Sequence, residues 1–245
     1  GFEIIEYDQL GSYYSDQPTD SSLWTVDRFV NEVEQVRSQL GLTKDNFYIL
    51  GNSWGGILGM EYVLKYPDNA KALIVSNMMA SGPDYGKYNL ELQKQMDKTT
   101  VDSIMLLQKT GQTDNPRYEA LLDGYYHQHL CRLDPFPDPV LRSFKHMNPI
   151  IYTMMQGPSE FGISGRLANW DIKDRLKEIK IPTLMIGAKY DTMDPEYMKW
   201  MSTQVQHGRY LYCPNGSHLA MWDDQGNYYP GIIQFIKDVD GGNFV

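Results

Sequence analysis

The sequence predicts an α/β fold in which a mostly parallel sheet is flanked by helices and a helical cap is inserted. Short apolar segments alternate with segments of helical periodicity in both the first and the last third of the chain, which is typical of parallel sheets covered on both faces. Between residues 81 and 165 this alternation stops, and a stretch rich in Met, Tyr, Gln and Leu keeps only the helical period. We therefore expect a core in two parts, residues 1–80 and 166–245, with a cap formed by residues 81–165.

The individual elements follow from local signals. Thr25 is a favourable N-cap for a helix whose apolar residues recur at three- and four-residue steps as far as Leu40, and Gly41 ends it. The predicted strands are residues 3–7, 47–50, 72–76, 181–187 and 209–212, and the predicted helices of the core are residues 26–40, 54–65, 195–204 and 229–239. Because the chain opens directly on the first of these strands without an initiator Met, we expect the first strands of the sheet to lie upstream.

Composition argues against several classes of protein. The 245 residues carry 31 acidic and 22 basic side chains, a formal net charge of −9, which argues against nucleic acid as a partner. No apolar run approaches the roughly 20 residues that span a bilayer, so we expect no membrane segment. Cys131 and Cys213 are too few for a disulfide framework. We expect a cytoplasmic protein, with a periplasmic or secreted location left open because a signal peptide would lie upstream.

A glycine-rich turn carries the first chemical motif. Residues 51–55 (GNSWG) fit the G-x-S-x-G pattern in the context it requires, with a predicted strand before it and a predicted helix after it. Glycines at positions 51 and 55 would prevent side-chain collisions in so sharp a turn. Ser53 is therefore the expected nucleophile of an α/β-hydrolase fold, and the backbone N–H of Trp54 is the expected oxyanion donor. The alternative is a tight turn whose serine only caps the helix.

In this class of enzyme the acid and the histidine follow the serine in that order along the chain. Residues 188–194 (AKYDTMD) follow a predicted strand, where open α/β sheets gather their active sites. Asp191 and Asp194 both qualify as the acid. We favour Asp191, because Asp194 directly precedes Pro195 and is the natural N-cap of the next helix. His218 lies in the loop after the last strand, from which a base can reach the serine.

The predicted chemistry is acyl transfer by Ser53, with His218 as base and Asp191 as the acid that orients it, and it needs no metal and no organic cofactor. His127 and His129 form an H-x-H pair, but no third ligand accompanies them at a recognisable spacing. We expect these two histidines to pack or to form hydrogen bonds.

Seven phrases of the sequence occur in an order that resembles one known family. They are residues 7–11 (YDQLG), 52–56 (NSWGG), 126–130 (YHQHL), 157–161 (GPSEF), 170–172 (WDI), 181–184 (IPTL) and 217–222 (SHLAMW). Over nearly its whole length the chain resembles the proline iminopeptidase (prolyl aminopeptidase) family of α/β hydrolases, especially the tricorn-interacting aminopeptidase branch.

The resemblance implies a serine peptidase that releases an N-terminal residue, often proline, from short peptides. It also implies that Glu160 binds the free α-amino group of the substrate, since a carboxylate can pair with an ammonium. Three features depart from the family. Its oxyanion loop, His-Gly-Gly-Pro, would lie upstream of Gly1; Thr192 stands where that branch often has a second amine-binding glutamate; and residues 12–15 (SYYS) replace the usual Gly-Arg after a small residue.

Other interpretations stay open. The same triad could serve an amino-acid amidase or esterase, and the fold could serve a non-catalytic binding protein. Aromatic and Met residues of the cap indicate an apolar pocket, although such a stripe is more often core; they are Tyr125, Tyr126, Tyr152, Met154 and Met155. The preferred N-terminal residue and the oligomeric state are not predicted.

Overall fold

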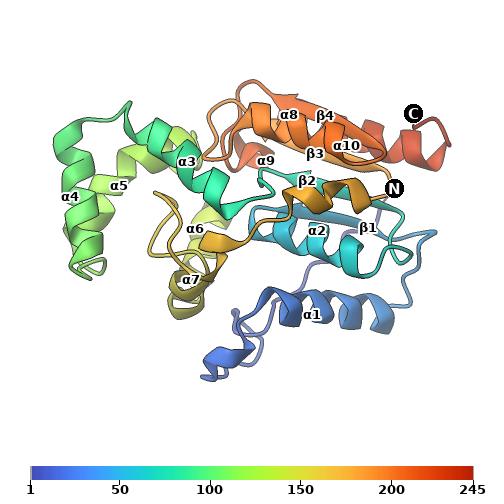
Figure 1. Cartoon of the computed structure of the whole chain (residues 1–245), viewed down its shortest axis with the longest axis horizontal. Coiled ribbons are helices and arrows are strands. Elements are labelled where there is room, and N and C mark those ends of the chain that lie inside the picture. The colour runs from blue at the N-terminus through green and yellow to red at the C-terminus, as the bar shows by residue number, and fades with distance from the viewer. Residues whose placement is uncertain (1, 245) are drawn as a thin grey trace.

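The computed structural model describes residues 2–244, and its centre is a four-stranded sheet in the order β1-β2-β3-β4 (Figure 1). The strands are β1 (Tyr48–Asn52), β2 (Ala72–Ser76), β3 (Thr183–Ala188) and β4 (Gly208–Cys213). Every neighbouring pair is parallel, with Tyr48 opposite Ala72 and Thr183 opposite Gly208. The prediction of a mostly parallel sheet is confirmed for these four strands.

Helices cover both faces of this sheet (Figure 1). They are α1 (Val26–Gln39), α2 (Trp54–Lys65), α8 (Pro195–Gln204), the short α9 (Ala220–Asp223) and α10 (Gln225–Asp240). Successive strand residues point to opposite faces, so Leu73 and Val75 pack with α1, α2 and α8, whereas Ala72 and Ile74 pack with α10. Burial on both faces explains why β2 and β3 are apolar without alternation.

Local signals set the helix ends as predicted. The Thr25 side chain accepts a hydrogen bond from the Arg28 N–H at the start of α1, and Gly41 follows the helix with a φ of 65°. Asp194 caps α8, its carboxylate accepting from the Glu196 N–H at 2.9 Å. The prediction that Asp194 is a helix cap is confirmed.

The stretch between β2 and β3 is helical. Its helices are α3 (Gly82–Gln93), α4 (Lys98–Lys109), α5 (Pro116–His129), α6 (Asp138–His146) and α7 (Pro149–Met155), followed by the 3₁₀ turns η2 (Arg166–Asn169) and η3 (Lys173–Glu178); another 3₁₀ turn, η1 (Ser21–Leu23), precedes α1. Part of this stretch has its own apolar cluster, which includes Leu92, Ile104 and Phe161. Figure 1 shows α4 at the end of the molecule that is remote from the sheet.

The predicted strand at residues 3–7 is wrong. These residues have no regular secondary structure and pair with none of the four strands, and the side chain of Ile4 is 83% exposed. A strand forms only where a neighbour's backbone accepts and donates its hydrogen bonds, and β-propensity cannot supply that neighbour.

None of the helices within residues 2–244 is both long enough and apolar enough to cross a membrane.

Candidate active site

Four polar residues of the site follow the carboxyl ends of the four parallel strands. Ser53 comes directly after β1 and Asn77 directly after β2, while Asp191 and His218 lie in the loops after β3 and β4. Because parallel strands end at the same edge of a sheet, residues 24 to 165 positions apart in the chain are brought together there.

Ser53 occupies a strained turn between β1 and α2. Its φ of 53° and ψ of −120° lie where residues other than glycine are rarely found, as expected for a nucleophile elbow. A Cβ on Gly51 would lie 2.0 Å from the Gly55 carbonyl oxygen, so Gly51 is required by close approach. At Gly55 an added Cβ would meet no atom within 4 Å, so the expectation that this glycine also prevents a collision is wrong; Gly56, which abuts Met78, has that role.

Trp54 is the first residue of α2, and its backbone N–H therefore has no acceptor within the helix. The helix N-terminus adds a partial positive charge at the same place, which favours an anion. The Trp54 side chain is held away from this position, with its indole N–H donating to the Gln9 side chain at 2.9 Å.

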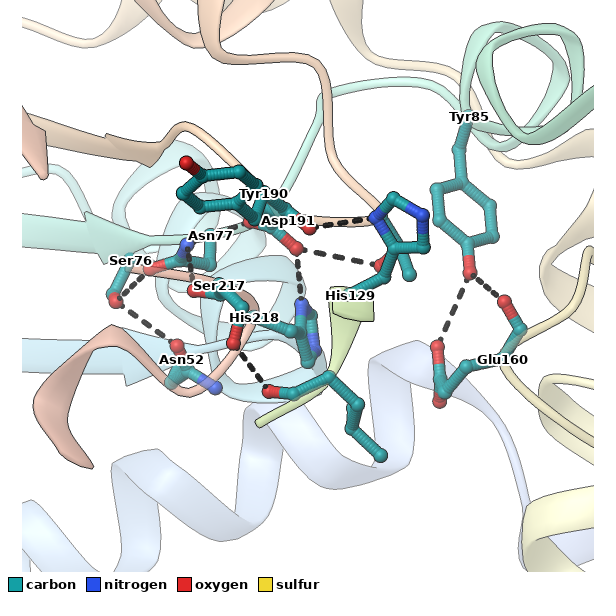
Figure 2. Close-up of polar contacts among 12 residues, drawn as sticks. Asn52, Ser76, Asn77, Tyr85, His129, Glu160, Tyr190, Asp191, Ser217 and His218 are labelled. Atoms are coloured by element: carbon teal, nitrogen blue, oxygen red, sulfur yellow. Dashed lines mark hydrogen bonds and ion pairs between the residues drawn. The ribbon is translucent and has the colours of Figure 1, made fainter. Parts of the chain in front are cut away.

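His218 and Asp191 form a buried pair. His218 Nδ1 lies 2.8 Å from Asp191 Oδ1, the Asp191 side chain is completely buried, and His218 is 3% exposed (Figure 2). Burial by itself would lower the pKa of His218, but the charge of Asp191 and the hydrogen bond to it outweigh burial, so the pKa of His218 is raised above its ordinary value. A carboxylate oxygen only accepts, so Nδ1 carries the proton and Nε2 of the neutral ring is free to accept one.

Ser53 and His218 line the same cavity, although no hydrogen bond joins their side chains in the part of the chain that the structure describes. Catalytic hydrogen bonds of this kind are often loose without substrate and tighten when it binds.

Asn77 is a partner of the acid that the sequence did not identify. Its Nδ2 donates to Asp191 Oδ2 at 2.6 Å and to the Ser217 carbonyl at 3.2 Å, and its Oδ1 accepts from Ser76 Oγ at 2.7 Å (Figure 2). Asn77 has a φ of 53°, the second such departure among the strand-end residues. A polar residue directly after a buried strand was the available signal, and it could have placed Asn77 at the sheet edge but not against the carboxylate.

The cavity above Ser53 has a volume of about 860 Å³. Its walls include Trp54 from the elbow, His218 from the last loop and Glu160 from the loop after α7. Most of the remaining wall is apolar, and α5, α6, α7, residues 9–12 and residues 134–136 all contribute to it. Tyr126, Tyr152 and Met155 line it as expected, whereas Tyr125 is a core residue of the inserted helices.

Glu160 is held by tyrosines from two helices. Tyr152 of α7 donates to Oε1 at 2.5 Å. Tyr85 of α3 donates to Oε2 at 3.1 Å (Figure 2). Burial and then the nearby charge of Glu160 raise the pKa of both phenols well above the ordinary value, so both remain protonated donors at neutral pH. The carboxylate is therefore fixed in a wall of the cavity that also contains Ser53.

His127 and His129 have different surroundings, and neither belongs to a metal-binding cluster. Within residues 2–244 no group of three or more His, Cys, Asp or Glu residues could hold a metal ion. His127 Nε2 lies 3.7 Å from Asp123 Oδ1 on α5, and His129 is buried with Nδ1 2.7 Å from the Tyr190 carbonyl oxygen. As expected, His129 forms a hydrogen bond, and His127 packs against Phe136 with their ring centroids 4.3 Å apart.

A parallel sheet with an elbow serine, a buried acid–histidine pair and a cavity above them defines the class of α/β hydrolases, and the alpha/beta hydrolase fold family matches residues 1–225. The proline iminopeptidase of Flavobacterium johnsoniae is 66% identical over 242 residues, which cover 98% of this chain and 82% of the relative. The crystal structure of a proline iminopeptidase from Mycobacterium smegmatis is similar with a TM-score of 0.86 at 28% identity, covering 96% of this chain and 80% of the other. The crystal structure of VinJ is similar with a TM-score of 0.90 at 27% identity, covering 95% and 80%. The chain belongs to the proline iminopeptidase family of α/β hydrolases.

Proposed function

We propose that this protein is a serine aminopeptidase that releases an N-terminal residue, above all proline, from short peptides. One observation carries the proposal: a single cavity of about 860 Å³ is lined by Ser53, by His218 and by the tyrosine-held carboxylate of Glu160. The name of the relatives, proline iminopeptidase, supports the same activity. Residues 81–165 act in this proposal as a cap that completes the substrate cavity over the core.

Acylation begins when a peptide's first carbonyl carbon lies above Ser53. His218 Nε2 takes the hydroxyl proton as Oγ attacks that carbon, and Asp191 stabilises the imidazolium through its bond to Nδ1. The Trp54 N–H donates to the carbonyl oxygen as it becomes an oxyanion. His218 then gives its proton to the departing amine, which leaves the first residue as an ester on Ser53.

Deacylation repeats these steps with water. His218 takes a proton from a water molecule, the resulting hydroxide attacks the ester, and the proton returns to Ser53 Oγ as the free amino acid leaves. The proposed cycle uses no metal ion and no organic cofactor.

Glu160 selects substrates by charge. A free N-terminus is an ammonium, or a secondary ammonium in proline, and its N–H groups donate to a carboxylate that is already oriented by Tyr85 and Tyr152. A blocked N-terminus has no positive charge and would leave Glu160 facing an uncharged group. Short peptides with a free N-terminus are therefore the substrates we propose.

The test is a panel of aminoacyl-naphthylamides, each with a free and with an acetylated amine, given to the wild type and to the Ser53→Ala variant. We expect hydrolysis of the free prolyl compound, little hydrolysis of its acetylated form and none by Ser53→Ala. Equal cleavage of both forms would indicate an esterase or amidase without amine recognition. A protein that neither cleaves the panel nor reacts with a fluorophosphonate would be a binding protein.

A further inference from the structure

His129 is a buried histidine that the proposed mechanism does not use. It ends α5, its side chain is 6% exposed, and Nδ1 lies 2.7 Å from the carbonyl oxygen of Tyr190, the residue before Asp191 (Figure 2). A carbonyl oxygen only accepts, so Nδ1 carries the proton and donates it. Burial lowers the pKa of His129, which keeps the ring neutral at neutral pH. The imidazole is thus a fixed hydrogen-bond donor to the acid loop.

Asn89 of α3 holds the other side of the same loop. Its Nδ2 donates to the carbonyl oxygen of Thr192, the residue after Asp191, at 3.3 Å, and its Oδ1 accepts from Tyr125 of α5 at 2.5 Å. The Asn89 side chain is completely buried. The carbonyl oxygens of Tyr190 and Thr192, the two neighbours of Asp191, therefore both accept hydrogen bonds from side chains of the inserted helices.

The end of α5 also holds the loop of the base. The His218 N–H donates to the His129 carbonyl at 3.0 Å, and the Leu219 N–H donates to the Leu130 carbonyl at 2.9 Å. The Ser217 hydroxyl donates to the same Leu130 carbonyl at 2.9 Å. The carbonyls of residues 129 and 130 thus accept hydrogen bonds from residues 217–219, the segment that carries the catalytic imidazole.

Arg132 connects the two loops a second time. Its guanidinium carbon lies 3.6 Å from the centre of the Tyr190 ring, and Nη1 donates to the Asn215 carbonyl at 2.8 Å. One short segment, residues 129–132, is therefore bound both to the loop that carries the acid and to the loop that carries the base.

We propose that His129, assisted by Asn89, is a positioning residue that sets the distance between Asp191 and His218 from the side of the inserted helices. The proposal rests on the triad of the proposed function. Neither side chain is assigned a contact with substrate. Each acts through the peptide it holds, because a loop with both carbonyls fixed presents its carboxylate to the imidazole in one orientation. A preformed acid–base pair needs no reorganisation during the reaction.

The experiment compares three substitutions of His129. His129→Asn places an amide nitrogen near the position of Nδ1, His129→Gln places it near Nε2, and His129→Leu has no donor. The matched control is His207→Gln, since His207 is exposed and precedes β4 at the opposite end of that strand from the site. The measurements are kcat and KM for the prolyl naphthylamide, the rate of Ser53 labelling by a fluorophosphonate, and Tm.

We expect His129→Leu and His129→Gln to lower both kcat and the labelling rate roughly tenfold to hundredfold, the effect of one unsatisfied buried acceptor on the pair's geometry, with KM nearly unchanged. His129→Asn should recover most of this loss, and His207→Gln should behave as wild type. If His129→Leu does not fold, the comparison of Asn with Gln carries the test.

Two results would overturn the proposal. The first is wild-type kcat and labelling in His129→Gln or His129→Leu, with only Tm lowered. The second is an equal loss in Asn and Gln variants, because a donor at the Nδ1 position would then be irrelevant. Failure of the wild type to cleave the prolyl compound while it is still labelled would instead refute the proposed substrate, since labelling requires only an activated serine.

Discussion

Replacing Glu160 by Gln tests whether the cavity recognises a free N-terminus. The substitution keeps the shape of the side chain and removes one negative charge. Tyr85 and Tyr152 can each still donate to the amide oxygen or accept from the amide nitrogen, so we expect the loop to keep its position. What is lost is a charge-assisted hydrogen bond between a carboxylate and the substrate's ammonium.

The magnitude follows from the strength of that bond. A hydrogen bond to a charged group contributes about 1.5–3 kcal/mol, and each 1.36 kcal/mol in the transition state is about tenfold in rate. We therefore expect kcat/KM for a prolyl naphthylamide to fall roughly tenfold to hundredfold. Hydrolysis of an acyl ester that has no amine, and the rate of fluorophosphonate labelling, should remain at the wild-type level.

Glu91→Gln is the matched control, because Glu91 of α3 loses the same charge at the surface, where it pairs with Lys94. Recognition of the amine by Glu160 is refuted if Glu160→Gln keeps its activity on the prolyl compound. It is equally refuted if ester hydrolysis falls by the same factor, because the carboxylate would then serve the fold or the triad and not the amine.

Three further predictions concern the edge of the sheet. Asn77→Gly keeps the φ of 53° accessible but leaves Asp191 Oδ2 without its donor. We therefore expect a loss of about 1–3 kcal/mol in the free energy of unfolding by urea, together with a lower kcat. Unchanged values for both would show that this bond is dispensable. In the proposed mechanism His218 must be neutral to accept a proton. Because its pKa is raised, kcat/KM should fall with decreasing pH around a midpoint above 6.5, and a midpoint below 6.5 would contradict the pairing with Asp191. Gly51→Ala should yield little folded enzyme in a thermal melt, whereas Gly55→Ala, with open space around it, should fold and melt near the wild-type temperature.

Much of the fold could be predicted from local signals. The helix after Thr25, the helix from Trp54 to Lys65 and the helix that Asp194 caps all lie where periodicity and capping residues place them. Asp194 could likewise be separated from Asp191, because an aspartate directly before a helix-starting proline caps its own helix. In these cases the deciding interactions lie within a few residues of each other in the chain.

The predictions that were wrong depend on contacts between segments that are far apart in the chain. Residues 3–7 have the composition of a strand, but pairing partners decide whether a strand forms, and none of the four strands pairs with them. Gly55 stands in a motif position that suggests crowding, whereas the crowded glycine is its neighbour Gly56, because Met78 from another loop packs there. Each depends on a segment that the local sequence does not contain.

The α/β fold, the serine at a strand-to-helix turn, and the aspartate and histidine that follow it in order could all be predicted from the chain, because order and spacing are properties of the chain. What surrounds these residues became known only from the folded structure. Asn77 against the acid, the tyrosines around Glu160, and the hold of His129 on the loop before Asp191 all join residues at least eight positions apart, and usually far more. The physical reason is that a hydrogen bond depends on distance and direction in space, which a parallel sheet sets by bringing distant loops to one edge.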